Sequence, residues 1–156
     1  MKPSIWGPHF WYILHTISFY YPENPSEYHK RAYHDFFHTL KDVIPCEECQ
    51  KHFAQHIQQY PITPHLDTRS ALVRWVIQIH NFVNKSTGKP EYTPEEVLYI
   101  YSLLEPVSPF IKVDQSKITE KKTYERNRGI LLIMILVALV IAIAIKIRYR
   151  YNYYNY

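Results

Sequence analysis

The two cysteines of this 156-residue chain lie three positions apart, directly after Pro45. Proline fits the first turn of a helix, because its missing N–H donor costs nothing there. If a helix runs from Cys46 to Tyr60, both sulfurs share one face, and the helical rise and radius place the two Cα atoms about 5 Å apart. A disulfide accepts that separation. The pair therefore predicts a helix that begins at this point of the fold.

The cysteine pair allows three interpretations: a redox disulfide, half of a zinc site, or an inert pair. Cys46 would lie in the first turn, where the helix dipole favours a reactive thiolate, although Glu47 and Glu48 oppose that effect. His52 and His56 follow, but Cys46 and His56 would be about 15 Å apart along one helix, too far for one zinc ion. With no third cysteine, a zinc site would need ligands from elsewhere.

Apolar residues recur at helical spacing in five segments, and no segment shows the alternation of a β-strand. The expected helices run from Trp6 to Tyr20, from a cap at Ser26 to about Asp42, from Pro45 to Tyr60, from a cap at Asp67 or Thr68 to about Lys85, and from Thr93 to about Leu104. Gly88 is expected to end the fourth helix in the left-handed conformation, and Thr93-Pro94-Glu95-Glu96 has capping-box spacing. The sequence predicts an all-α fold, a four-helix bundle with a short fifth helix.

The basic excess of the chain lies in its C-terminal third. Residues 1–110 carry 9 Lys and Arg against 11 Asp and Glu, whereas residues 111–156 carry 9 against 3. This distribution argues against a nucleic-acid-binding domain and for charges that flank a membrane segment. Gly129 to Ile145 is an uninterrupted apolar run, at the short end for a bilayer core. Lys and Arg flank both of its ends, so charge bias leaves the orientation open.

Four parts are expected along the chain: a helical domain over 1–105, a linker over 106–128, a single transmembrane helix over 129–147 and a Tyr-rich tail over 148–156. The first residues show no apolar stretch of signal-peptide type, which favours a C-terminal anchor with the helical domain in the cytosol. A buried core helix is the alternative interpretation of the apolar run. It is disfavoured because the run has no polar face.

Three segments together resemble the Erv/ALR family of FAD-linked sulfhydryl oxidases. They are Trp6 to Thr16 followed by Tyr20-Tyr21-Pro22, Pro45-Cys46-Glu47-Glu48-Cys49 with Phe53, and Trp75 with His80 to Pro90. Their order and spacing carry the resemblance, which covers roughly Ile5 to Leu104 and leaves out the anchor. The Trp-Gly-Pro opening, the small size and the lack of extra cysteines look most like the members found in large cytoplasmic DNA viruses.

The resemblance implies a helical bundle that holds FAD next to the cysteine pair. Cys46 would be the outer sulfur, attacked by a substrate thiolate, and Cys49 the inner sulfur, whose thiolate passes electrons through the flavin to O₂ and gives hydrogen peroxide. The residues that would bind the cofactor are Gly7, His9, Phe10, Trp11, His15, Phe53, His80, Asn81, Val83, Asn84, Lys85, Lys89 and Tyr92. No metal site is expected, and the six histidines from His29 to His65 are interpreted as solvated surface.

The residue types themselves allow a plainer interpretation as well. His80, Asn81 and Asn84 place donors and acceptors at helical spacing on one face, which suits a polar ring system or a ribose, and Lys89 could meet a phosphate. Without the resemblance, these aromatic, histidine and asparagine side chains would be core or capping groups. The competing functions are a membrane-tethered helical adaptor and a flavin-free disulfide exchanger.

Three features depart from the family pattern. Ile77 stands where some members carry a cysteine of a second disulfide, Pro8 stands where longer relatives use an arginine, and no shuttle pair of cysteines exists. Electrons are therefore expected to arrive by direct exchange with a small dithiol protein of the thioredoxin-like type. A reducing cytosol does not preserve disulfides unaided, so a membrane-bound oxidase would serve a virus-assembly or virion membrane.

Aromatic side chains crowd the first two expected helices. One small bundle does not need that much apolar surface for its own core, so an exposed apolar patch is expected. The family resemblance implies that such a patch joins two copies of the chain. We therefore expect a two-fold homodimer.

Overall fold

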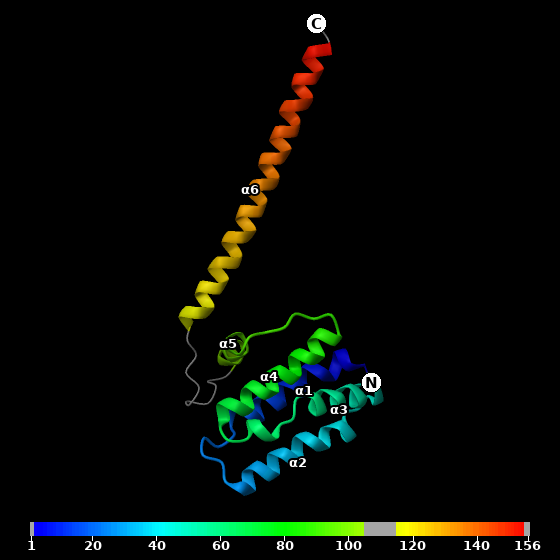
Figure 1. The fold of residues 1–156 in the computed structure, drawn as a ribbon, viewed down its shortest axis with the longest axis vertical. Helices are drawn as coiled ribbons and strands as arrows, with labels where there is room; N and C mark the ends of the chain where they lie inside the picture. The colour runs from blue at the N-terminus through cyan, green and yellow to red at the C-terminus, as the bar shows by residue number, and fades with distance from the viewer. Residues whose placement is uncertain (1, 105–114, 155–156) are drawn as a thin grey trace. The chain divides into compact units, whose positions relative to one another are not determined.

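The computed structural model describes residues 2–104 and 115–154, and all of their regular secondary structure is helical. The elements in chain order are α1 (Pro3–Phe19), α2 (Glu27–Val43), α3 (Glu47–Gln59), the short 3₁₀ helix η1 (Thr63–His65), α4 (Arg69–Ser86), α5 (Pro94–Leu104) and α6 (Gln115–Tyr154) (Figure 1). The expected all-α class, with a four-helix bundle and a short fifth helix, is confirmed.

Polar side chains set the beginnings of three helices as the sequence predicts. Ser26 caps α2, because its Oγ accepts the backbone N–H of His29 while the His29 ring accepts the N–H of Ser26. Thr68, rather than Asp67, caps α4. Thr93 and Glu96 form the expected capping box of α5, with bonds of 2.8 and 3.3 Å. These short-range bonds satisfy N–H groups that would otherwise lack partners.

Two helix starts differ from the sequence prediction. α1 begins at Pro3 instead of Trp6, because Pro3 occupies the first helical position, where proline is favoured. α3 begins at Glu47, so the placement of Cys46 in the first turn and of Pro45 at the helix start is wrong. Cys46 has an extended backbone and acts as the N-cap residue of α3. A cap residue takes that conformation because its side chain must reach the N–H groups of the first turn.

α4 is the central helix of the bundle. It contacts α1, α3 and α5, while α2 packs along α3, and Figure 1 shows these helices side by side. Trp75 of α4 is almost fully buried and meets the ring of Phe37 edge to face, with 5.2 Å between centroids. Its indole N–H donates to the carbonyl of Tyr60. A second cluster, which includes Ile77, lies under α5. Apolar packing therefore surrounds the position where some family members carry a cysteine.

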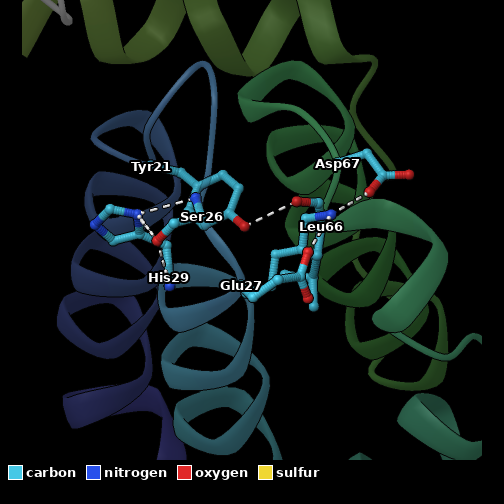
Figure 2. A network of polar contacts seen from close by, with 7 residues as sticks. Tyr21, Ser26, Glu27, His29, Leu66 and Asp67 are labelled. Carbon is cyan, nitrogen blue, oxygen red and sulfur yellow. Dashed lines mark hydrogen bonds and ion pairs between the residues drawn. The ribbon is translucent and has the colours of Figure 1, made fainter.

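Polar contacts tie the turn between α1 and α2 to the segment before α4, as Figure 2 shows. The hydroxyl of the fully buried Tyr21 donates to the carbonyl of Leu66 at 2.8 Å. Lys30 bridges Glu27 and Asp67 on the outside. The Nε of Arg69 donates to the carbonyl of Tyr21, so the same turn is held by a buried cation. These bonds fix the end of α1 relative to the beginning of α4.

Removing the hydroxyl of Tyr21 tests this tie. In Tyr21→Phe the Leu66 carbonyl stays buried without its donor, so we expect the free energy of unfolding to fall by about 1 to 2 kcal/mol. Urea unfolding followed by circular dichroism measures the change. Tyr20→Phe is the matched control, because the neighbouring tyrosine is exposed and its loss should cost almost nothing. Equal stability of both variants would contradict the role of the bond.

The second unit of the chain contains the helix α6. α6 begins at Gln115, inside the stretch expected as a linker. Its segment Thr123–Ile147 is long and apolar enough to cross a membrane, and the most apolar 18-residue stretch of that segment has a mean hydropathy of 3.2. The expected span over 129–147 lies within that segment. The first part of the expected linker, with Pro106 and Pro109, and the last residues of the tail lie outside the described ranges. The division into four parts stays a prediction.

Candidate active site

Cys46 and Cys49 are joined by a disulfide at the beginning of α3, with 5.2 Å between their Cα atoms, as the helical geometry predicts. The Sγ of Cys46 accepts a hydrogen bond from the backbone N–H of Cys49 at 3.3 Å. The positive end of a helix stabilises a thiolate, so the pair lies where thiol–disulfide exchange is favoured. Both residues are half-buried and pack against the core of the bundle. The pair therefore meets both solvent and the bundle interior.

The interior behind the disulfide is apolar. Phe53 lies one helical turn after Cys49 on the same face of α3 and is buried. Side chains from all four bundle helices line a gap that is too narrow for a water molecule. They are Trp11, Leu14, Phe37, Phe53, Trp75, Val76 and Ile79. Aromatic and aliphatic groups, rather than polar ones, thus back the reactive pair.

Two histidines from distant parts of the chain meet between α1 and α4. The Nε2 atom of His15 and the Nδ1 atom of His80 lie 3.0 Å apart. Trp11 stacks on the His80 ring, with centroids 4.0 Å apart and an angle of 6° between the ring planes. Burial, and then the neighbouring His80, lowers the pKa of His15 to about 3. Burial, and then the charge of Lys89, lowers the pKa of His80 to about 4. Both rings are therefore neutral near pH 7.

The neutral state restricts the proton positions of the pair. The Nδ1 atom of His15 is buried and has no hydrogen-bond partner. A buried N–H without an acceptor is rarer in proteins than an under-satisfied acceptor. The favoured arrangement has the His15 Nε2–H donating to His80 Nδ1, which leaves Nε2 of His80 protonated. The pair thus presents an uncharged N–H donor on the half-buried face of α4.

The asparagines that follow His80 bind the loop between α4 and α5. The side-chain amide of Asn81 donates to the carbonyl of Tyr92 at 2.8 Å and accepts its N–H at 3.0 Å. The carbonyl of Asn84 accepts the backbone N–H of Lys89 at 2.8 Å. Gly88 takes the expected left-handed conformation, with φ of +69°. The loop therefore folds back on α4 and carries Lys89 to within electrostatic reach of His80.

The remaining residues predicted to bind a cofactor are less closely grouped. Phe10 lies between the rings of Trp6 and Trp11, with centroids 5.6 and 6.4 Å away. Gly7 and Val83 are half-buried, whereas His9, Lys85 and Tyr92 are exposed. The structure thus brings Trp11, His15 and His80 into direct contact. The role in cofactor binding stays a prediction for every residue of the predicted set.

Residues 8–102 match the sequence model of the Erv1 / Alr family, which is more than half of the chain. The chain belongs to the Erv1/Alr family. The match takes in the helix start with its disulfide, the paired histidines and the clamped loop. The family resemblance drawn from the three sequence segments is therefore confirmed.

Individual members and solved structures agree with this assignment. The chain is 41% identical over 108 residues to the "Probable FAD-linked sulfhydryl oxidase" of Acanthamoeba polyphaga mimivirus, covering 68% of this chain and 76% of the relative. It is 32% identical over 82 residues to the mitochondrial FAD-linked sulfhydryl oxidase ERV1 of Saccharomyces cerevisiae, covering 53% of this chain and 42% of that protein. The crystal structure of the yeast Erv1 core is similar, with a TM-score of 0.57 at 29% identity, over 60% of this chain and 78% of the other.

Tyr101 of α5 belongs to the surroundings of the histidine pair in this Erv1/Alr member, and sequence reasoning missed it. Its ring centroid lies 5.1 Å from that of His15 and 5.7 Å from that of Tyr12. Burial raises the pKa of Tyr101 well above its usual range, so the hydroxyl stays protonated. The available signal was the spacing of Val97 and Tyr101, which places both on one face of α5.

The interpretation of all six remaining histidines as solvated surface is wrong for His56. Its ring lies 5.5 Å from that of Phe82, its Nε2 atom is buried, and burial lowers its pKa. The residue shares the face of α3 that carries Cys49 and Phe53 toward α4, and this periodicity forces it inward. Burial also lowers the pKa of His38 and of His65.

The depressed pKa values of the histidine pair predict acid sensitivity. In the unfolded chain both histidines have a pKa of about 6.5, whereas in the folded chain the pKa of His15 is about 3 and that of His80 about 4. The unfolded state therefore binds more protons than the folded state as the pH falls. Stability should therefore drop on the order of 3 to 5 kcal/mol between about pH 6.5 and about pH 4.5. Urea unfolding at both pH values measures the drop.

The controls separate this pair from other acid-sensitive groups. His15→Phe removes one titrating ring while keeping an aromatic side chain, and should make the stability less dependent on pH. His9→Asn alters an exposed histidine of the same helix and should leave the dependence as in the wild type. A pH dependence that His15→Phe does not change would refute the assignment.

Proposed function

We propose that the chain is an FAD-linked sulfhydryl oxidase that forms disulfides in a dithiol protein and transfers the electrons to O₂. A substrate thiolate attacks Sγ of Cys46, the Cys46–Cys49 bond breaks, and Cys49 leaves as a thiolate. The second substrate thiol then attacks the substrate sulfur of the mixed disulfide and releases Cys46. The substrate has lost two electrons and two protons, and the cysteine pair has gained them.

FAD, when bound, supplies the carrier that accepts these two electrons from the pair and delivers them to O₂, giving one H₂O₂ for each disulfide formed. The residues present fit such a group. Trp6 Nε1, His15 Nδ1 and His56 Nε2 are buried nitrogens without partners on α1 and α3. Aromatic faces at Trp11 and Phe53, the donor on His80 and the cation of Lys89 suit a flat ring system with a polar, phosphate-bearing arm.

The observation that carries the proposal is the placement of a half-buried disulfide at a helix start, packed against the apolar and aromatic core of the bundle. The proposal predicts that the purified full chain carries flavin absorbance and consumes O₂ when a dithiol is added. A well-folded, colourless chain that FAD cannot reconstitute would refute it. In that case exchange of thiols without O₂ uptake would indicate a disulfide exchanger, and normal function without the cysteines would indicate an adaptor.

The electron donor is proposed to be a small dithiol protein of the thioredoxin-like type that reaches Cys46 directly. The chain contains no cysteines besides the pair, so it offers no internal relay. Cys46 is partly exposed at the N-cap of α3, where an incoming thiolate can approach. Reduced thioredoxin should therefore support O₂ uptake at a rate that saturates with its concentration, whereas a large folded monothiol protein should not.

We infer that α6 anchors the redox domain to a membrane, with the domain on the cytosolic side of a virus-assembly or virion membrane. The apolar run from Gly129 to Ile145, which lies within the candidate span Thr123–Ile147, and the basic residues Arg128 and Lys146 that flank the run support an anchor. The full chain is expected to sediment with membranes and to resist carbonate extraction. A chain that ends at Leu104 should remain in the soluble fraction. Recovery of the full chain in the soluble fraction would contradict the anchor.

A homodimer is proposed on the basis of exposed apolar groups on α1 and α2. The exposed large apolar side chains of these helices are Ile5, Tyr12, Ile13, Tyr20, Tyr28, Phe36 and Val43. Apolar patches of this kind often mark an interface between protein chains. Light scattering of the helical domain should give twice the mass of one chain, and a monomer at micromolar concentration would contradict the proposal.

A further inference from the structure

The α4–α5 loop depends on one buried side-chain amide. Asn81 is 8% exposed, and both ends of its amide are used within the protein. Its Nδ2 atom donates to the carbonyl of Tyr92 at 2.8 Å, and its Oδ1 atom accepts the N–H of the same residue at 3.0 Å. The side chain pairs with the backbone as a residue of a neighbouring strand would. Both polar atoms of the Asn81 side chain therefore form hydrogen bonds with the loop.

The clamp formed by Asn81 and Tyr92 completes a loop that is already bonded at its other points. The backbone N–H of Lys89 donates to the carbonyl of Asn84, and Thr93 begins the capping box of α5. The stretch from Lys89 to Thr93 is thus bonded to α4 at its start and to α5 at its end. The clamp adds a third attachment, because it bonds the loop to α4 at Asn81, the residue next to His80.

Lys89 is the charged group that this loop carries. Its side chain is exposed, and its charge is a cause of the lowered pKa of His80, so the two groups lie within electrostatic reach. His80 itself is held by Trp11 and His15. The clamp therefore fixes the backbone of the loop that carries this cation, next to the residue that follows His80.

We propose that Asn81 is a positioning residue that holds the Lys89 ammonium ready to meet a phosphate of the bound dinucleotide. This inference rests on the proposed FAD-linked function. Asn81 acts through the Tyr92 backbone and Lys89, and its clamped edge is not itself a cofactor ligand. A flexible loop would spread the lysine over many positions, and the cofactor would have to order it on binding.

A double-mutant cycle tests the proposal on the full chain. Asn81→Ala, Lys89→Gln and the double variant are compared with the wild type by the release of FAD on dilution, at low and at high salt. We expect each single variant to weaken FAD binding about tenfold, the double variant to be no weaker than either, and all three to lose most of the salt dependence. Coupling of this kind shows that Asn81 acts through Lys89.

Hydrogen exchange gives a readout that does not require turnover. The Tyr92 amide should exchange about tenfold faster or more in Asn81→Ala and at the wild-type rate in Lys89→Gln. Thr93→Val is the matched control, because it removes the cap of the same loop without touching the clamp. It should leave both the Tyr92 amide and the salt dependence of FAD release unchanged. If Asn81→Ala does not fold, Asn81→Gln keeps the amide but displaces it by one methylene.

Two outcomes would overturn the inference alone: additive effects of the two substitutions on FAD release, or an Asn81 variant that keeps the full salt dependence. Either result would show that Asn81 supports the site independently of Lys89. A folded wild-type chain that binds no FAD would instead overturn the proposed function, and the phosphate role of Lys89 with it. The two failures are therefore distinguishable in the same set of measurements.

Discussion

Replacing Cys49 by serine should abolish dithiol-dependent O₂ uptake while the flavin remains bound. A serine oxygen cannot form a disulfide with Cys46, so no electron pair can be taken up from a substrate. The half-buried Cys49 loses little packing in this substitution, because sulfur and oxygen differ modestly in size. An oxygen electrode measures turnover, and visible absorbance of the purified variant measures the bound flavin.

Two further variants make this result specific. Cys46→Ser should be equally inactive, because the mixed disulfide with the substrate forms on that sulfur. Glu48→Gln is the matched control between the cysteines. It removes an exposed charge and should retain turnover within a few-fold of the wild type. Residual O₂ uptake in Cys49→Ser above a few per cent of the wild-type rate would show that electrons reach O₂ without the pair.

Truncating Trp75 should produce the largest loss of stability in the helical domain. The side chain is 1% exposed, packs edge to face on Phe37, and donates its indole N–H to the Tyr60 carbonyl. Trp75→Ala leaves a large cavity and a buried carbonyl without its donor, so we expect a loss of about 3 to 5 kcal/mol. Typical domains are stable by about 5 to 15 kcal/mol, so the variant should be close to unfolding at 25 °C.

Urea unfolding at one fixed FAD concentration measures this loss, because a bound ligand adds to the apparent stability. Trp75→Phe keeps most of the buried aromatic surface and loses the hydrogen bond, and should cost about 1 to 2 kcal/mol. Tyr28→Ala removes an aromatic ring that is 71% exposed and should change stability by less than about 0.5 kcal/mol. A loss below about 1 kcal/mol in Trp75→Ala would contradict the central place of this residue.

Local chemistry explains why so much of the fold could be predicted from the sequence. Caps at Ser26, Thr68 and Thr93 act within one helical turn, and Gly88 ends α4 through its own backbone conformation. The spacing of the two cysteines follows from helix geometry alone. The helix expected from Pro45 begins two residues later, at Glu47, because residues that precede a helix and residues that begin it read alike in sequence.

The candidate site could be predicted only in part. Sequence spacing cannot show that His80 meets a histidine 65 positions earlier, or that Trp11 stacks on it. Tyr101 entered the site, and His56 turned inward, for the same reason: each position depends on which helix face meets which neighbour. The cofactor residues inferred from the resemblance stay predictions, whereas the disulfide is present in the structure.

The sequence by itself determined the helices, their ends, the reactive pair and the apolar segment, because hydrogen bonds within a turn and runs of apolar residues are properties of short stretches. Only the tertiary structure decided that His15 and His80 share a hydrogen bond and that Asn81 clamps the backbone of Tyr92. The first contact joins residues 65 positions apart, and the second spans the 11 positions of the α4–α5 connection. They form only when α1, α4 and α5 pack together and exclude water, because a buried polar atom can then gain a hydrogen bond only from within the protein.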